Sequence, residues 1–164
     1  MGMQLPGEVR DFLSVVGFDW PAGDETALLD LGQTWTQLSG MIERQVDQAH
    51  QAARLVWDRN ASDMVDAFSS MWNGQEGPAG QMSRNGTGGD IIGAGLMVCA
   101  GIVLALKVNV IVQVTLTLIS IATAVASAFV TFGASAAVVP LLREACKRLL
   151  DYLLDQAIAK VLGA

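Results

Sequence analysis

Charged side chains are scarce in this sequence, which limits how much of the chain can face water. They make up 16% of the 164 residues, whereas soluble domains carry about 25%. Apolar residues account for 52%, and the mean hydropathy is +0.42. A chain of this size forms one ordinary domain with one core, and that core cannot hold all of the apolar surface. The excess has to contact a membrane, a second copy of the chain or a partner protein.

Clustered basic residues are also missing. The net charge is −6, and residues 1–90 hold thirteen of the sixteen acidic residues but only five of the ten basic ones. Because phosphate binding depends on clustered Lys and Arg side chains, this distribution of charge excludes nucleic acid as a partner.

Residue types that carry catalysis or bind metals are few. His50 is the only histidine, and we interpret it as a solvated helix residue, because a catalytic or metal site needs several convergent groups. Cys99 and Cys146 lie in apolar or amphipathic stretches and are interpreted as core residues. The glycines of residues 86–89 lack the spacing of a phosphate loop. We therefore expect a non-enzymatic protein without catalytic residues, metal or cofactor.

Residues 5–17 predict a short amphipathic helix. Gly17 marks its end, and Trp20 favours extended backbone because a proline follows it. The apolar positions recur at helical spacing and are Val9, Phe12, Leu13 and Val16. This helix is expected to bury one face.

Residues 24–57 predict a long helix with Asp24 as its N-cap. Nine positions spaced three and four residues apart form a heptad repeat, and eight of the nine are apolar. These positions are Leu28, Leu31, Trp35, Leu38, Ile42, Gln45, Ala49, Ala52 and Val56. The repeat predicts side-by-side packing against another helix.

A second, shorter helix is predicted after Asn60, which offers a cap and marks a turn. Its apolar stripe is Ala61, Met64, Val65, Phe68, Met71 and Trp72. Two amphipathic helices joined by a few residues form a helical hairpin, so residues 1–78 are assigned to an N-terminal helix and a hairpin. Residues 73–90 contain six glycines and predict a loop. Within it, residues 79–90 form a Gly-rich hinge, and Asp90 caps the following helix.

Residues 91–142 contain a single charged residue, Lys107. A mildly polar stripe runs along them and includes Asn109, Gln113, Thr117 and Ser120. Alternating valines over residues 108–114 would also suit a local strand, but the longer period favours helix. Gly133-Ala134-Ser135 interrupts the run, and Pro140 opens an amphipathic C-terminal helix.

The predicted fold is all-α and bundle-like. It consists of a long helical hairpin, a long apolar helix and a C-terminal amphipathic helix. Residues 91–164 form an apolar helix pair in this prediction, which either packs onto the hairpin or inserts into a membrane.

The order of aromatic residues around the predicted hairpin turn is distinctive. The chain reads Val56-Trp57-Asp58-Arg59-Asn60, then Val65-Asp66-Ala67-Phe68, and then Trp72 and Gly77-Pro78. This order resembles the Trp-x-Gly family of small helical hairpins that type VII secretion systems export. It looks like the variant hairpin at the N-terminus of large actinobacterial polymorphic toxins, the type found in a mycobacterial outer-membrane channel protein with a C-terminal toxin. The opening helix and the apolar segment extend the resemblance over most of the chain.

Some positions depart from the family pattern. Arg59 stands where the motif's glycine would follow Trp57, and Trp72-Asn73-Gly74 spells the motif only at the end of the second helix. The family's export signal places an acid four residues after a tyrosine, whereas Gln156 stands at that distance from Tyr152. A Sec-type signal is also absent from the first residues. We therefore expect a signal-peptide-independent route in which a partner supplies the export signal.

The resemblance implies a secretion-targeting and docking domain, the N-terminal module of a toxin. Its implied partners are small helical-hairpin proteins of the Trp-x-Gly family and the type VII secretion machinery. The chain would be cytoplasmic before export and secreted or held in the cell envelope afterwards. The candidate docking residues are Leu28, Leu31, Trp35, Leu38, Ile42, Trp57, Phe68 and Trp72.

A membrane-inserting channel or pore is the alternative, and self-association would serve either function. In a channel, the polar stripe of Asn109, Gln113, Thr117 and Ser120 would face a lumen or neighbouring helices. Lys107 is costly within such a segment if it faces lipid, whereas residues 91–142 as a whole are costly if they face water.

Overall fold

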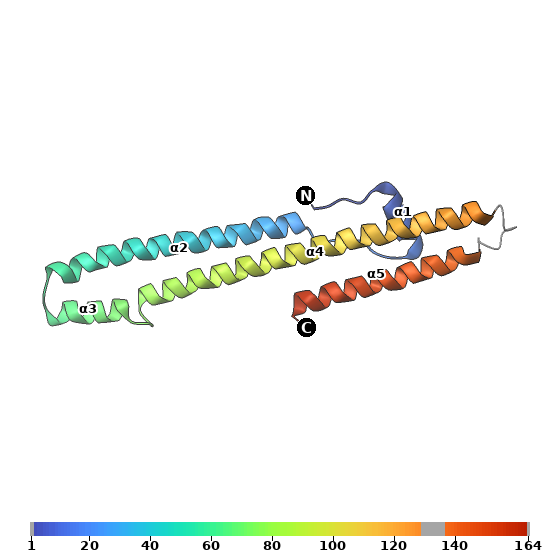
Figure 1. Cartoon of the computed structure of the whole chain (residues 1–164). Helices are drawn as coiled ribbons and strands as arrows, with labels where there is room; N and C mark the ends of the chain where they lie inside the picture. The colour runs from blue at the N-terminus through green and yellow to red at the C-terminus, as the bar shows by residue number, and fades with distance from the viewer. Residues whose placement is uncertain (1, 129–136, 164) are drawn as a thin grey trace. The chain divides into compact units, whose positions relative to one another are not determined.

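The computed structural model describes residues 2–128 and 137–163, and helices make up most of them. The helices are α1 (Gly7–Val16), α2 (Glu25–Arg59), α3 (Asp63–Asn73), α4 (Pro78–Ala128) and α5 (Val139–Leu162) (Figure 1). No strand occurs among these described residues, so the all-α prediction is confirmed. The local strand considered for residues 108–114 is wrong, because they lie within α4. The predicted break at Gly133-Ala134-Ser135 lies outside the described residues.

The chain divides into two compact units, which are described separately. The first unit contains Met1–Ala27 and Cys99–Ala164, and the second contains Leu28–Val98. This division differs from the predicted parts 1–78, 79–90 and 91–164. The N-terminal helix was predicted to belong with the hairpin, whereas α1 packs with α5 and the C-terminal part of α4.

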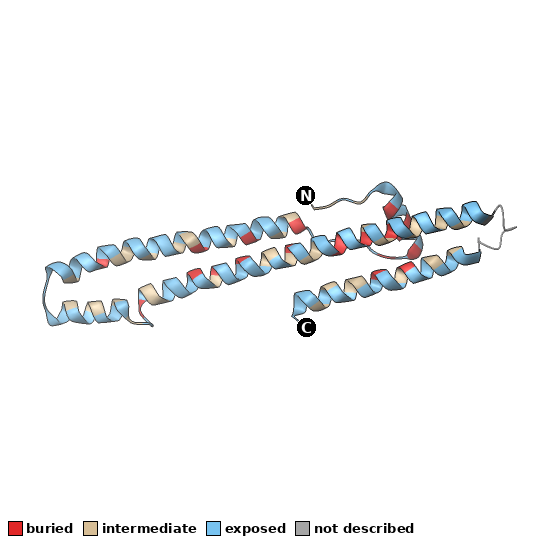
Figure 2. Cartoon of the chain, viewed as in Figure 1, coloured by how far each residue is buried: buried red, intermediate tan, exposed pale blue. Residues whose placement is uncertain are grey.

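The core of the first unit lies where α1 contacts α4 and α5. All four apolar positions predicted for α1 are buried there. They form one core with Leu106, Val110 and Val114 of α4, and with Cys146 and Leu150 of α5. Figure 2 colours the buried residues of the chain red. Gly17 ends α1 with a φ of 66°, a left-handed conformation that glycine adopts without strain. The chain then turns so that Phe18 joins the same core.

The second unit is held together by α2 and the glycine-rich start of α4. The predicted loop over residues 73–90 is limited to residues 74–77. The hinge predicted at 79–90 is wrong, because α4 begins at Pro78 and continues through the later glycines. Proline is favourable in the first turn of a helix, where its missing N–H has no intrahelical partner. Asp90, predicted as a cap, lies exposed within α4.

Glycines on one face of α4 allow its backbone to approach α2 closely. A Cβ atom added to Gly93 would lie 2.6 Å from Thr36 Oγ1 and 2.8 Å from the carbonyl oxygen of Gly32. The Ser39 hydroxyl, 1% exposed, donates a hydrogen bond of 2.6 Å to the carbonyl oxygen of Gly86. Glycine costs about 1 kcal/mol within a helix, and here close packing outweighs that preference.

Helix ends follow the predictions in part. Asp24 caps α2 as expected, since its carboxylate accepts hydrogen bonds of 3.0 Å from the N–H groups of Thr26 and Ala27. Asn60 lies in the predicted turn but does not cap α3. Its amide instead donates to the carbonyl oxygen of Val56 at the end of α2, and Ser62 caps α3.

Candidate functional site

The predicted docking stripe of α2 divides into two rows. Leu28, Trp35 and Ile42 are half-buried. Leu31 and Leu38 instead leave 47% and 40% of their surface exposed. The stripe therefore lies at the edge of the packed face and not at its centre.

Small residues occupy the inward face of α2 within the second unit. The buried positions there are Gly32, Ser39 and Ala53, which are spaced by multiples of seven. The helical pattern of large apolar side chains did not predict these small residues. Their heptad spacing, together with the three- and four-residue spacing of Gly86, Gly89 and Gly93, was the available signal.

An outer apolar row consequently remains on α2, which we define as Leu31, Leu38 and Met41. Met41 is 49% exposed. Thr34 and Gln45 share this side of the helix at helical spacing, and both are uncharged. None of these five side chains carries a charge that a partner would have to desolvate.

The aromatic docking candidates lie together where α2 meets α3. The ring centroids of Trp57 and Phe68 are 5.8 Å apart, and those of Phe68 and Trp72 are 6.1 Å apart. All three side chains are half-buried. Trp35 lies elsewhere on α2, where its backbone carbonyl oxygen would be 3.5 Å from a Cβ atom added to Gly89 of α4. The structure therefore unites three predicted anchors in one cluster and separates the fourth from them.

His50 belongs to this aromatic cluster, so the prediction of a solvated residue is wrong. Its ring is half-buried, and its centroid lies 6.1 Å from that of Trp57 in an edge-on arrangement. The indole N–H of Trp72 donates a hydrogen bond of 3.2 Å to His50 Nδ1. The residue bridges α2 and α3.

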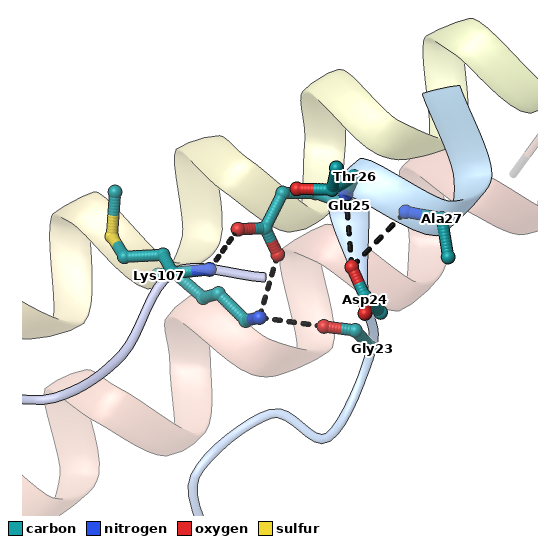
Figure 3. Close-up of polar contacts among 7 residues, drawn as sticks. Gly23, Asp24, Glu25, Thr26, Ala27 and Lys107 are labelled. Atoms are coloured by element: carbon teal, nitrogen blue, oxygen red, sulfur yellow. Dashed lines mark hydrogen bonds and ion pairs between the residues drawn. The ribbon is translucent and has the colours of Figure 1, made fainter. Parts of the chain in front are cut away.

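The charge within the apolar segment is neutralised inside the first unit (Figure 3). Lys107 is 3% exposed, and its ammonium donates to Glu25 Oε2 at 2.6 Å and to the carbonyl oxygen of Gly23 at 2.5 Å. The same ammonium lies 5.8 Å from the ring of Trp20, within reach of a cation–π attraction. Glu25 also accepts a hydrogen bond from the backbone N–H of Met3.

The electrostatics of this pair favour the ionised state. The hydrogen bond from Lys107 lowers the pKa of Glu25 from 4.5 to about 2, with a further contribution from the Met3 N–H. The pair joins the N-terminal segment to α4 and explains how Lys107 is tolerated in an apolar helix.

Within the described residues, no group of three potential metal ligands occurs. The sequence analysis recognised the cost of Lys107 but offered no signal for its partner, which lies 82 positions away.

The predicted polar stripe of α4 is spread over different environments. Asn109 and Ser120 are exposed, whereas Gln113 and Thr117 are half-buried. The hydroxyls of Thr117 and Ser120 donate to the carbonyl oxygens four residues earlier, at 2.8 and 2.9 Å. Three further hydroxyls do the same and belong to Thr115, Thr123 and Ser127. These side chains present no unused O–H donor to their surroundings.

The side of α4 turned away from the core of the first unit is apolar as well. Val108, Val112 and Leu116 leave 41%, 46% and 53% of their surfaces exposed. Among the described residues, one helical stretch, within Asp63–Ser127, is long and apolar enough to cross a membrane by length and composition. Only 22% of its most apolar window is buried. An apolar groove of about 210 Å³ also lies between α4 and α5 and is lined in part by Ile102 and Ile158.

Comparison with known proteins identifies one match. The family model described as "WXG100 like domain" matches residues 3–147. No curated protein and no solved structure matches the chain. The matched span begins before α1 and ends within α5, so it covers most of the sequence.

Proposed function

The chain belongs to the family of WXG100-like domains, and we propose that it is a non-enzymatic docking module that binds a small helical-hairpin protein of the same family. Proteins of the WXG100 family are helical hairpins exported by type VII secretion without a signal peptide. This chain is accordingly a helical protein related to type VII secretion.

The outer row of α2 carries the docking proposal. Leu31, Leu38 and Met41 each leave 40% or more of their surface exposed, although they belong to a helix whose heptad pattern predicts a neighbouring helix on that side. Full burial of one such side chain stabilises by about 1.5–3 kcal/mol. Because roughly half of each surface is still available, a partner helix that covers the row gains about 1 kcal/mol per residue.

Complex formation tests the row directly. The chain is coexpressed with each small WXG100-family protein encoded in the same genome, and complexes are measured by size-exclusion chromatography with light scattering. Leu38→Glu should weaken the complex by at least about tenfold, because a carboxylate would be desolvated at the interface. Leu141→Glu on α5, at a position that is 68% exposed, is the matched control and should leave binding unchanged. Equal binding by both variants would exclude the outer row.

We further propose that the domain directs an attached toxin to the type VII machinery, with the partner supplying the export signal. The similarity to hairpins at the N-terminus of polymorphic toxins supports this role. Residues 1–164 fused to a reporter should be secreted by a strain with an intact type VII ATPase and retained by a strain without it. Retention in both strains, with the partner coexpressed, would contradict this role.

A membrane-inserting channel is the second candidate, and the surface of α4 favours it. The apolar side of α4 and the internally bonded hydroxyls together match the requirements of a lipid-facing helix, in which polar groups must be satisfied within the segment. The pairing of Lys107 with Glu25 removes the remaining charge from that surface.

Liposomes distinguish the two candidates. A channel predicts that the purified chain floats with lipid vesicles and makes them permeable. The pair of substitutions Asn109→Leu and Gln113→Leu should then reduce the conductance if the polar stripe lines the lumen. The docking module alone predicts a different result. The chain should stay monodisperse without detergent once its partner is bound, and it should not float with lipid vesicles.

A further inference from the structure

Helix α3 is attached to α2 by few contacts. None of its residues is buried, and Met64 and Met71 on its outer side are 81% and 54% exposed. Its attachment depends on the aromatic cluster, where Phe68 contacts Trp57 and Trp72 contacts His50. The contact between Trp72 and His50 is the only side-chain hydrogen bond between α2 and α3 among the described residues.

That hydrogen bond defines the protonation state of His50. An indole nitrogen can only donate, so His50 Nδ1 has to carry a lone pair and accept from Trp72 Nε1. The imidazole is therefore neutral, with its proton on Nε2. If Nδ1 became protonated, two N–H groups would face each other and the bond would be lost.

We propose that His50 and Trp72 form a pH-sensitive clasp, which holds α3 against α2 when His50 is neutral and releases it when His50 is protonated. An imidazole in water exchanges its proton at about pH 6.5. Because the hydrogen bond needs an unprotonated Nδ1, protonation of the ring removes it, and acidification then favours opening. The direction of this pH effect follows from the hydrogen bond itself, in which Trp72 donates and His50 accepts.

No charged group forms a hydrogen bond or an ion pair with His50 among the described residues. The charged residues of the neighbouring segments are Asp47 and Arg54 on α2, Asp63 and Asp66 on α3, and Glu76 and Arg84 before and within the start of α4. Glu76 and Arg84 lie 3.6 Å apart and pair with each other. Asp47 and Asp66 are exposed. Asp47 lies on α2 with His50, so its attraction for the imidazolium is the same in both states of the hairpin. Asp66 lies on α3, and its attraction opposes release, but solvent makes it small.

The ring of Trp57 also attracts an imidazolium. Because Trp57 and His50 both lie on α2, this attraction does not hold α3, which keeps only the contact of Phe68 with Trp57. Opening therefore leaves Phe68 and Trp72 free on one side and Trp57 free on the other. These three rings are candidate docking residues, so the consequence for partner binding rests on the proposed function. The clasp itself does not depend on that function.

Hydrogen exchange measures the opening of α3 in the absence of a partner protein. The full chain is labelled at about pH 7.5 and at about pH 5.5, on either side of the imidazole range, and the amides of Asp63–Asn73 are followed by mass spectrometry after correction for intrinsic exchange. Loss of one hydrogen bond of average strength should increase the opening of α3 by roughly fivefold at the lower pH. The amides of α1 (Gly7–Val16) serve as the internal reference and should not respond.

Two variants distinguish the loss of this hydrogen bond from a general effect of acid on the protein. For each variant, the exchange of the α3 amides is compared between the two pH values. His50→Gln offers a side-chain oxygen that accepts from Trp72 at any pH, so its α3 exchange should not change with pH. Trp72→Phe retains an aromatic side chain but removes the N–H donor. Protonation of His50 then breaks no hydrogen bond, and the response to pH should also disappear.

The proposal is overturned if wild-type α3 exchanges equally at the two pH values, or if either variant shows the wild-type response. Such results would leave the docking function intact, because the Leu38→Glu experiment is performed at neutral pH on a different part of α2. Conversely, an intact clasp with no partner bound at the outer row would remove the docking function alone.

Discussion

Removing one member of the Lys107–Glu25 pair should destabilise the protein far more than replacing both members. Lys107→Met leaves the Glu25 carboxylate in a site where its side chain is only 10% exposed. Breaking a buried ion pair in this way costs about 3–5 kcal/mol, because an uncompensated charge stays desolvated. We expect about 3 kcal/mol here, which corresponds to a decrease in Tm of about 6–12 °C for a chain of this length.

The double variant Lys107→Met/Glu25→Gln provides the matched comparison. A neutral amide at position 25 can still accept the hydrogen bond of the Met3 N–H, and no charge is left without a partner. The double variant should therefore regain most of the stability lost by Lys107→Met. Urea unfolding followed by far-UV circular dichroism gives the free energy of unfolding for the wild type, both single variants and the double variant, which completes a double-mutant cycle.

Acid provides an independent measure of the same pair. The pKa of Glu25 is about 2 in the folded protein and 4.5 in an unperturbed carboxyl group. Because the folded-state pKa is the lower one, the stabilisation is complete above pH 4.5 and is lost as the pH falls toward 2. The shift corresponds to about 3 kcal/mol. This part of the acid dependence should be absent from Lys107→Met.

A single result would refute this reasoning. If Lys107→Met unfolds within about 0.5 kcal/mol of the wild type, the variation expected for surface substitutions, the pair contributes nothing to the first unit. The electrostatic explanation of Lys107 in an apolar helix would then be wrong.

Two further predictions concern packing. Gly93→Ala should destabilise the protein by about 1–3 kcal/mol, because the added Cβ would lie 2.6 Å from Thr36 Oγ1. Gly95→Ala should instead stabilise it by about 0.5–1 kcal/mol, because alanine has the higher helix propensity and no atom lies within 4 Å of the added Cβ. Thermal unfolding gives the Tm of both variants. Equal changes in Tm would contradict the close approach of α4 to α2. Leu150→Ala, at a fully buried position, should cost about 2–5 kcal/mol, and its neighbour Leu149→Ala, 39% exposed, should cost clearly less in the same urea unfolding measurement.

Helical periodicity was sufficient where a helix buries one face of large apolar residues. The four apolar positions of α1 are all buried as predicted, and Asp24 and Pro140 stand at the predicted starts of α2 and α5. Cys146 is buried in the core as expected, although Cys99 is only half-buried. In these helices, the spacing of apolar residues and the residues that start or stop a helix act over short stretches of sequence. The position and the buried face of the helix therefore depend mainly on neighbouring residues.

Glycine misled the sequence analysis because its local preference and its tertiary use are opposite. Six glycines in residues 73–90 favour a loop by propensity, yet Gly86 and Gly89 lie buried in α4. The missing side chains lower the stability of an isolated helix and also allow a second helix to approach. Which effect prevails depends on α2, where the small residue Ser39 lies against both of these glycines.

The sequence by itself determined that this protein is helical, poor in charge, and supplied with more apolar surface than one core can bury. Composition and periodicity are properties of the chain and need no knowledge of contacts. Only the tertiary structure decided that Glu25 neutralises Lys107, that His50 accepts a hydrogen bond from Trp72, and that Leu31 and Leu38 remain exposed. Each of these depends on residues brought together from distant positions, and a linear pattern carries no information on which distant side chains meet.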